Sequence, residues 1–217
     1  MSPTSLDREP LRARRRCLQF SGAAVALSAL WLAGCDMPSS GGTAATSFKG
    51  IDITGADYAR TLSLTDQNGQ RRTLADFKGK VTVVFFGFTQ CPDVCPTTMA
   101  ELAQVKASLG KDGDRVQGVF ITVDPERDTA ESLKTYMKGF DPSFVALRGS
   151  PEEIAATAKE FKVFYAKVPG KIEGSYSVDH TAGSYVFDAQ GRVRLFVRYG
   201  GGAQNLAADL KALLAAG

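Results

Sequence analysis

Hydrophobic residues follow one another almost without interruption from Val81 to Phe88. A run of this length is typical of a strand buried on both faces of a sheet. After Thr89 the apolar residues take the spacing of a helix, and its apolar side carries Met99, Leu102, Val105 and Leu109. The pattern therefore predicts a buried strand that leads directly into an amphipathic helix.

The rest of the chain alternates between strand and helix patterns. Strands are expected at Val116–Val123, Phe144–Leu147, Tyr185–Phe187 and Val193–Tyr199. Asp128 can cap a helix with Glu131 as its return partner. Ser150 and Glu153 form a capping box for another helix, which ends near Phe161. A last helix carries Leu206, Leu210, Leu213 and Leu214.

Two segments are predicted to form hairpins. Tyr58–Leu74 alternates weakly around Asn68-Gly69, a strong signal for a two-residue turn. Phe164–Asp179 mixes apolar and polar residues, which indicates an inserted hairpin or a long loop. The order of elements predicts an α/β fold with a mixed central sheet flanked by helices. With two cysteines after the first central strand, this looks like a thioredoxin-like fold with an N-terminal hairpin and an inserted hairpin before the histidine loop.

Residues 1–34 have the pattern of an export signal. Basic residues precede an apolar stretch from Leu18 to Leu32, which is short for a membrane-spanning helix. The stretch ends in Leu32-Ala33-Gly34-Cys35, which resembles the lipobox of bacterial lipoproteins. That resemblance implies cleavage before Cys35 and lipidation of this cysteine; an uncleaved anchor helix is the alternative. Either way, the rest of the chain is expected outside the cytoplasm and tied to a membrane.

Residues 35–50 are expected to form the lipid anchor and a flexible tether, because small residues without periodicity fill most of them. Residues 51–217 suffice for one domain with one core. The chain has 26 basic and 23 acidic residues, of which the first 34 positions hold five and two, leaving 21 of each. This balance argues against nucleic acid as a partner.

The cysteines point to function rather than to structural cross-linking. Cys17 belongs to the predicted signal peptide and Cys35 to the lipid anchor, so the domain keeps Cys91 and Cys95. Structural disulfides usually join distant segments, and a bridge across so small a loop would stabilise the fold little. The positive N-terminus of the predicted helix is expected to favour the thiolate of Cys95, with Cys91 in the preceding turn.

Metal binding fits this pair of sulfurs. At positions i and i+4 they can face the same side, whereas a disulfide needs a closer approach and local rearrangement. Soft thiolates select copper(I), zinc or an iron–sulfur cluster. A cluster usually needs four cysteines and structural zinc four ligands, whereas copper(I) is satisfied by three. His180, the single histidine, is the candidate third ligand. Asp179 is either an acceptor that orients its ring or a loop cap.

Three motifs, FGFTQCPDVCPTTM, ITVDPERDT and YSVDHTAGSYVFD, closely resemble those of the Sco/SenC copper chaperones, and the resemblance extends from Tyr58 to the C-terminus. It implies a thioredoxin-like fold and copper, as copper(I) or copper(II), bound by Cys91, Cys95 and His180. We interpret Met99 as a core residue rather than a thioether ligand. Five residues of the second motif are interpreted as helix-starting and loop-fixing residues rather than ligands: Asp124, Pro125, Arg127, Asp128 and Thr129.

The resemblance implies a copper metallochaperone that helps to assemble the binuclear copper centre of cytochrome c oxidase. Its implied partners are the copper-bearing oxidase subunit and a copper donor or reductant. The predicted location is the periplasmic side of the bacterial inner membrane. The alternative is an enzyme, a thiol–disulfide oxidoreductase with Cys91 and Cys95 as its redox pair. Such enzymes normally use CxxC beside a cis-proline. This chain has CxxxC and no proline in Asp179–Ser184, which favours the chaperone.

Overall fold

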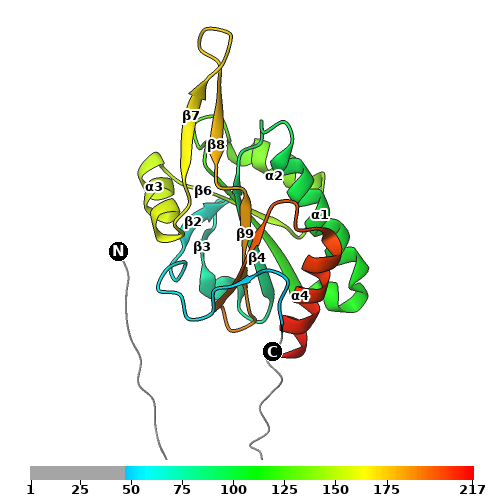
Figure 1. The fold of residues 1–217 in the computed structure, drawn as a ribbon. Helices are drawn as coiled ribbons and strands as arrows, with labels where there is room; N and C mark the ends of the chain where they lie inside the picture. Colours follow the sequence, from blue (N-terminus) through cyan, green and yellow to red (C-terminus); the bar gives the residue numbers. More distant parts are fainter. Residues whose placement is uncertain (1–46) are drawn as a thin grey trace, which may run out of the picture. The chain divides into compact units, whose positions relative to one another are not determined.

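The computed structural model describes residues 47–217. Their main sheet has the strand order β1-β10-β9-β4-β5-β6-β2-β3 (Figure 1). The pairs β4–β5 and β5–β6 are parallel, and the other pairs are antiparallel, so the sheet is mixed as predicted. Its strands are β1 (Ile51–Asp52), β2 (Ser63–Asp66), β3 (Arg71–Thr73), β4 (Val81–Gly87), β5 (Val116–Thr122), β6 (Val145–Arg148), β9 (Gly183–Phe187) and β10 (Val193–Arg198).

Helices cover both faces of this sheet. In Figure 1, α1 and α4 lie side by side and α3 lies on the opposite side of the molecule. None of the helices between residues 47 and 217 combines the length and the apolar character that crossing a bilayer requires. The helices are α1 (Val94–Ser108), α2 (Ala130–Lys138), α3 (Pro151–Glu160) and α4 (Ala203–Ala215), with short 3₁₀ helices η1 (Leu74–Phe77) and η2 (Gly110–Arg115).

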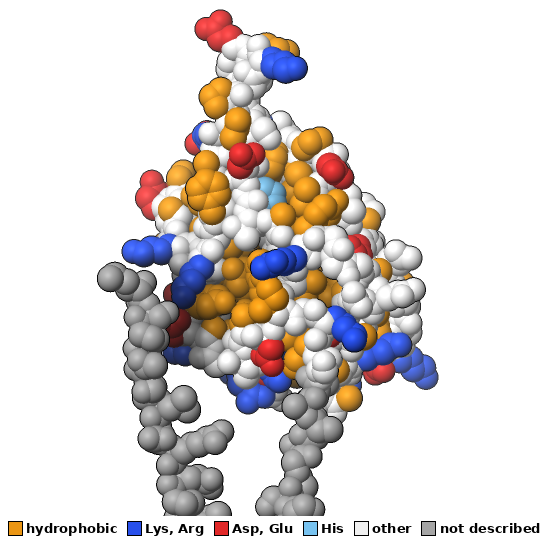
Figure 2. Space-filling view, viewed as in Figure 1, with side chains coloured by type: hydrophobic (Ala, Val, Ile, Leu, Met, Phe, Trp, Pro, Cys, Tyr) orange, Lys and Arg blue, Asp and Glu red, His pale blue; other side chains and the backbone are white. Residues whose placement is uncertain are grey.

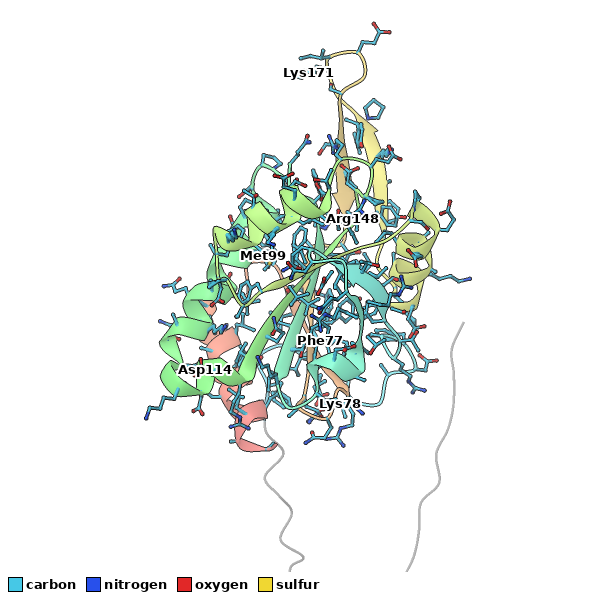
Figure 3. All side chains as sticks on the ribbon, turned by 180° about the vertical axis from the view of Figure 1, so that it is seen from behind. Phe77, Lys78, Met99, Asp114, Arg148 and Lys171 are labelled. Carbon is cyan, nitrogen blue, oxygen red and sulfur yellow. The ribbon has the colours of Figure 1, made fainter. Side chains whose placement is uncertain are left out.

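β4 is the buried central strand that the sequence pattern predicts. All seven of its residues are buried, because β5 and β9 pair along its two edges and helices cover its two faces. Successive side chains point to opposite faces. Phe86 packs on Phe161 after α3, with ring centroids 5.2 Å apart, whereas Phe85 lies toward α1. Met99 points into the core from α1 and is fully buried, which confirms its assignment (Figure 3).

The starts of two helices test the capping predictions. α3 begins with the predicted capping box, in which Ser150 and Glu153 each accept a backbone N–H of the other. The prediction for α2 is wrong by one residue, since Thr129 is the N-cap and accepts the N–H of Ser132 at 3.1 Å. Asp128 does not cap the helix because its buried carboxylate accepts hydrogen bonds from two other threonines.

Both predicted hairpins are present. β2 and β3 form the first one, at the edge of the main sheet beside β6. The second consists of β7 (Tyr165–Pro169) and β8 (Tyr176–His180), which pair with each other and with no other described strand. This second hairpin projects from the body of the domain, with Lys171 near its tip (Figures 1 and 3). His180 is the last residue of β8, whereas the sequence analysis placed it in a loop.

The described chain begins beside the C-terminal helix. The Asp209 carboxylate of α4 is 3% exposed and accepts the backbone N–H groups of Lys49 and Gly50, each at 2.7 Å. The last residues of the predicted tether are therefore fixed to the domain. The predicted signal peptide at 1–34 and the predicted lipidation site Cys35 lie outside the described residues.

Candidate metal centre

Three side chains from different parts of the chain meet at one end of the sheet. Cys91 lies in the turn after β4, Cys95 is the second residue of α1, and His180 ends β8. Their two sulfur atoms and one ring nitrogen lie within 4.8 Å of one another. The structure thus brings together the residues selected from the sequence, although 85 positions separate Cys95 from His180.

The imidazole presents one nitrogen to the sulfurs and the other to the backbone. Nε2 of His180 lies 3.4 Å from Sγ of Cys95, and Nδ1 lies 3.1 Å from the carbonyl oxygen of Thr181. Since a carbonyl only accepts hydrogen bonds, we assign the ring proton to Nδ1 and a free lone pair to Nε2. The Thr181 carbonyl thus occupies the position that we expected for the carboxylate of Asp179, which is exposed on β8. An orienting role of Asp179 stays a prediction.

The two cysteines have different environments. Cys95 is fully buried and Cys91 is half-buried, and both thiols are free. The backbone N–H of Cys95 donates to the Cys91 sulfur at 3.4 Å. Burial raises the pKa of the Cys95 thiol well above its ordinary value. The expected bias of Cys95 toward thiolate is therefore wrong for the metal-free protein, because the loss of hydration outweighs the helix N-terminus.

Gly87, at the end of β4, makes room for Cys95. A Cβ atom at this position would lie 2.9 Å from the Cys95 sulfur and equally close to the rings of Phe85 and Phe120. Gly87 was not among the site residues predicted from the sequence. A glycine inside an apolar strand is a recognised signal of close approach and could have indicated this role.

Two phenylalanine rings enclose the imidazole. Phe85 and Phe88 contact His180 edge-on, with centroid distances of 5.8 and 6.0 Å and interplanar angles of 78° and 89°. Burial among these apolar groups lowers the pKa of His180 below its ordinary value of 6.5. The ring is therefore neutral at pH 7, and the neutral imidazole is the form that binds metal ions.

The site opens into a groove of about 420 Å³. Cys91 and Val94 line one side of this groove, Ser177–Ala182 the other, and Phe164 belongs to its lining although its side chain is 65% exposed. Figure 2 shows the histidine at the surface between hydrophobic side chains. A partner can therefore reach Cys91 and His180 from solvent, whereas Cys95 is enclosed.

Asp128 fixes the turn that leads to the first cysteine. Its fully buried carboxylate accepts the N–H of Thr89 at 3.1 Å, the hydroxyl of Thr89 at 2.5 Å and the hydroxyl of Thr122 at 2.6 Å. Thr89 lies two positions before Cys91, and Thr122 ends β5. This geometry agrees with the loop-fixing role interpreted for the second motif.

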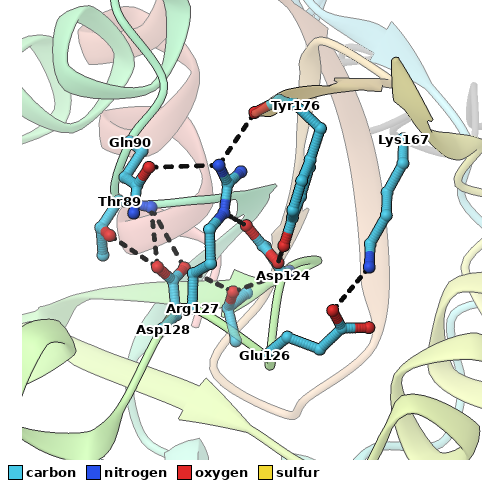
Figure 4. Close-up of polar contacts among 9 residues, drawn as sticks. Thr89, Gln90, Asp124, Glu126, Arg127, Asp128, Lys167 and Tyr176 are labelled. Carbon is cyan, nitrogen blue, oxygen red and sulfur yellow. Dashed lines mark hydrogen bonds and ion pairs between the residues drawn. The ribbon is translucent and has the colours of Figure 1, made fainter. Parts of the chain in front are cut away.

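Arg127, from the same motif, connects the cysteine turn with the β7–β8 hairpin (Figure 4). Its Nε pairs with the carboxylate of Asp124, which is 1% exposed. Its Nη1 donates to the carbonyl of Tyr176 at 2.8 Å and to the side chain of Gln90 at 3.1 Å. Gln90 and Tyr176 were not among the site residues predicted from the sequence, because no spacing in the chain indicates that they meet.

Two sulfurs and one imidazole nitrogen form a donor set for a soft metal ion, and their number matches the low coordination that copper(I) accepts. The three candidate ligands lie on the first and third sequence motifs, and Arg127 and Asp128 lie on the second. The similarity to known proteins extends beyond these motifs. A model of the SCO1/SenC family matches residues 52–215. The chain belongs to the SCO1/SenC family.

Individual SCO1/SenC relatives agree with this assignment. The SCO2-like protein of Rickettsia felis is 41% identical over 132 residues, which are 60% of this chain and 64% of that protein. The match thus spans just under two thirds of that relative's length. The structure of Bradyrhizobium japonicum ScoI with copper bound is 45% identical, with a TM-score of 0.65, over 70% of this chain and 97% of that chain.

A further structure similar to this chain is that of BsSco, a relative in which a disulfide switch is described. BsSco, described as a member of the Sco family of cytochrome c oxidase assembly proteins with a disulfide switch, is 25% identical with a TM-score of 0.57. The superposition covers 76% of this chain and 98% of that chain. These likenesses confirm the predicted thioredoxin-like arrangement of a mixed sheet flanked by helices.

Proposed function

We propose that this SCO1/SenC protein is a copper metallochaperone that holds its cargo through Sγ of Cys91, Sγ of Cys95 and Nε2 of His180. The observation that carries the proposal is the convergence of these three atoms within 4.8 Å beside a groove open to solvent. The copper bound to the Bradyrhizobium relative supports the choice of metal.

Loading exchanges protons for copper. Cys95 is protonated at neutral pH because burial raises its pKa, so copper uptake releases its proton. His180 is already neutral, and its Nε2 lone pair faces the sulfurs. Cys91 lies at the groove, where an incoming ligand of a partner reaches the cargo first. Transfer therefore proceeds by stepwise ligand exchange, with the enclosed Cys95 releasing copper last.

The proposed recipient is the copper-bearing subunit of cytochrome c oxidase, whose binuclear copper centre the protein helps to assemble. The assembly function of BsSco supports this recipient. A copper donor or a reductant is the second proposed partner.

The proposed location is the periplasmic side of the inner membrane, with the domain tethered through lipid on Cys35. The lipobox-like sequence that ends at Cys35 supports this anchor. A SCO1/SenC lipoprotein of Bacillus anthracis supports it further; it is 28% identical, with a TM-score of 0.58 over 73% of this chain and 98% of that chain.

The test is an anaerobic copper(I) titration of the reduced domain against a competing chelator. His180→Ala should weaken binding sharply, since it removes one of three ligands, while the reduction potential of the Cys91–Cys95 pair changes much less. Lys171→Ala is the matched control, because this exposed residue lies near the tip of the same hairpin, away from the three proposed ligands. Unchanged copper affinity in His180→Ala would show that the proposed site is wrong.

A thiol–disulfide oxidoreductase is the second candidate. The unequal burial of the two free thiols favours it, because a partly exposed sulfur that attacks and an enclosed one that resolves suit disulfide exchange. Its target would be the copper-ligand cysteines of the oxidase subunit. Catalytic reduction of a model disulfide by the metal-free domain would support this enzyme. Activity retained in Cys91→Ser would contradict both candidates.

A further inference from the structure

The strand that carries His180 is not part of the main sheet. β7 and β8 pair only with each other among the described strands, whereas Cys91 and Cys95 follow the central strand β4. No backbone ladder in residues 47–217 therefore fixes the imidazole relative to the sulfurs. Side-chain contacts and the chain connections must do so.

β8 is held at its C-terminal end by its neighbours. The N–H of Thr181 donates to the carbonyl of Phe164 at 2.9 Å, and the N–H of Phe164 donates to the hydroxyl of Thr181 at 3.0 Å. Val178, in the middle of the strand, is 4% exposed and packs in the core. These contacts hold the middle and the C-terminal end of β8 against the domain. They do not involve Tyr176, at the N-terminal end of the strand.

Arg127 supplies that second attachment (Figure 4). Its guanidinium carbon lies 3.7 Å from the centroid of the Tyr176 ring, and its Nη1 donates to the Tyr176 carbonyl at 2.8 Å. The hydroxyl of Tyr176 donates to Asp124 at 2.9 Å, and Asp124 also pairs with Nε of Arg127. Arg127 is thus attached to the Tyr176 end of β8 in three ways: by stacking, by a backbone hydrogen bond and through the buried carboxylate that both residues contact.

The same guanidinium also contacts the turn that precedes the first cysteine. Its Nη1 donates to the side chain of Gln90, the residue before Cys91, at 3.1 Å. A nearby ion pair between Lys167 and Glu126, at 2.6 Å, joins β7 to the same loop. Both of its members are about half exposed, so that pair contributes little. Arg127 is therefore the main link at this end of the hairpin.

We propose that Arg127 is a positioning residue for the metal centre, which acts through Tyr176 to fix the direction in which His180 presents Nε2 to the cysteines. With both ends held, β8 cannot rotate about its axis. Without Arg127 the Tyr176 end keeps only the hydrogen bond from its hydroxyl to Asp124 and the contact of its ring with Lys167, at 4.6 Å. It loses the stacking and the hydrogen bond to its carbonyl, so the imidazole is free to turn away from Cys95. The expected effect on copper affinity rests on the proposed function, whereas the positioning of the imidazole by Arg127 does not.

The first test is a double-mutant cycle in copper(I) affinity. Arg127→Lys keeps a cation for Asp124 but loses the planar fork and the stacking on Tyr176. It should weaken copper binding about 10- to 100-fold, the effect typical of residues that orient a ligand. In a His180→Ala background the same change should have little further effect, because Arg127 acts through the imidazole. An equal loss in both backgrounds would overturn the inference.

The second test needs no copper. His180 is the single histidine of the chain, so its ring protons give unambiguous NMR signals in the reduced, metal-free protein. Phe85 and Phe88 lie edge-on to this ring, and their ring currents make its chemical shifts sensitive to its position. Arg127→Lys should move these signals toward the values of an exposed histidine. Unmoved signals would overturn the inference even if the wild type binds copper.

Matched variants separate positioning from folding. Arg72 pairs through its Nε with Asp66, which is 1% exposed, at 2.8 Å on the edge hairpin β2–β3. Arg72→Lys should therefore cost stability without changing the His180 signals or the copper affinity. Tyr176→Leu removes the stacking partner and keeps the Arg127–Asp124 pair, so it replaces Arg127→Lys if that variant does not fold. If the wild type binds no copper, the proposed function fails while the NMR result still decides the role of Arg127.

Discussion

Gly87→Ala is expected to affect the metal centre by crowding, without replacing a proposed ligand. The new Cβ atom would lie 2.9 Å from the Cys95 sulfur, from Phe85 and from Phe120, whereas ordinary contact begins at about 3.4 Å. Each of these groups must therefore move by about 0.5 Å. β4 cannot move instead, because β5 and β9 pair with it on both sides.

The expected cost follows from these displacements. Overfilling a tightly packed core by a methyl group typically costs about 1–3 kcal/mol. For a domain of this size, about 2 kcal/mol lowers the unfolding midpoint by roughly 4–8 °C. The shift of the Cys95 sulfur is about as large as the tolerance of a functional site, roughly 0.5 Å. Phe85, which contacts His180, is displaced as well. Copper(I) affinity should therefore fall about tenfold or more.

Gly118→Ala is the matched control in the adjacent strand β5. Its Cβ atom would lie 2.7 Å from the ring of Phe144, and none of its three nearest atoms belongs to a candidate ligand. Urea unfolding should show a similar loss of stability for both variants, and chelator competition should show a loss of copper affinity for Gly87→Ala alone. If Gly87→Ala loses stability but binds copper like the wild type, the close contact with Cys95 does not constrain the site.

Five further outcomes are expected. Copper(I) affinity should rise with pH in chelator competition at pH 6 to 8, because burial raises the pKa of Cys95 and its proton must leave. Burial lowers the pKa of His180 in the folded state, so the unfolded chain binds more protons below pH 6.5. The stability of the metal-free protein to urea should therefore fall from pH 7.5 to 5, and it should fall less in His180→Ala. Thr129→Ala should cost about 1 kcal/mol in thermal unfolding through its lost cap, and Asp128→Ala more, because it leaves buried donors unpaired. Met99→Ala should cost about 2–5 kcal/mol without changing the copper stoichiometry.

Periodicity was sufficient to predict the elements that local patterns control. The apolar run at β4 and the capping box at Ser150 follow from neighbouring residues, and both occur as expected. The cap of α2 was placed one residue early, because Asp128 and Thr129 are both good caps in isolation. Only the tertiary fold brings Thr89 and Thr122 to Asp128 and so leaves the capping role to Thr129.

At the candidate site, too, some features could be predicted from the sequence and others depend on the tertiary fold. The donor types of Cys91, Cys95 and His180 could be selected from their chemistry and their scarcity in the chain, and the structure brings them together. The protonation state of Cys95 could not, because it depends on how deeply the first turn of α1 is buried. Tyr176 was likewise missed, since its contact with Arg127 joins residues 49 positions apart.

The hydrogen bonds from Lys49 and Gly50 to Asp209 determine which element bears a force applied at the start of the described domain. Traction at residue 47 acts on the C-terminal helix α4 through one enclosed carboxylate before it reaches β1. The sulfurs and the imidazole belong to other elements, at the β4–α1 junction and at the end of β8. If the domain is tethered as proposed, tension on the tether would therefore act on a different part of the molecule from the three proposed copper ligands.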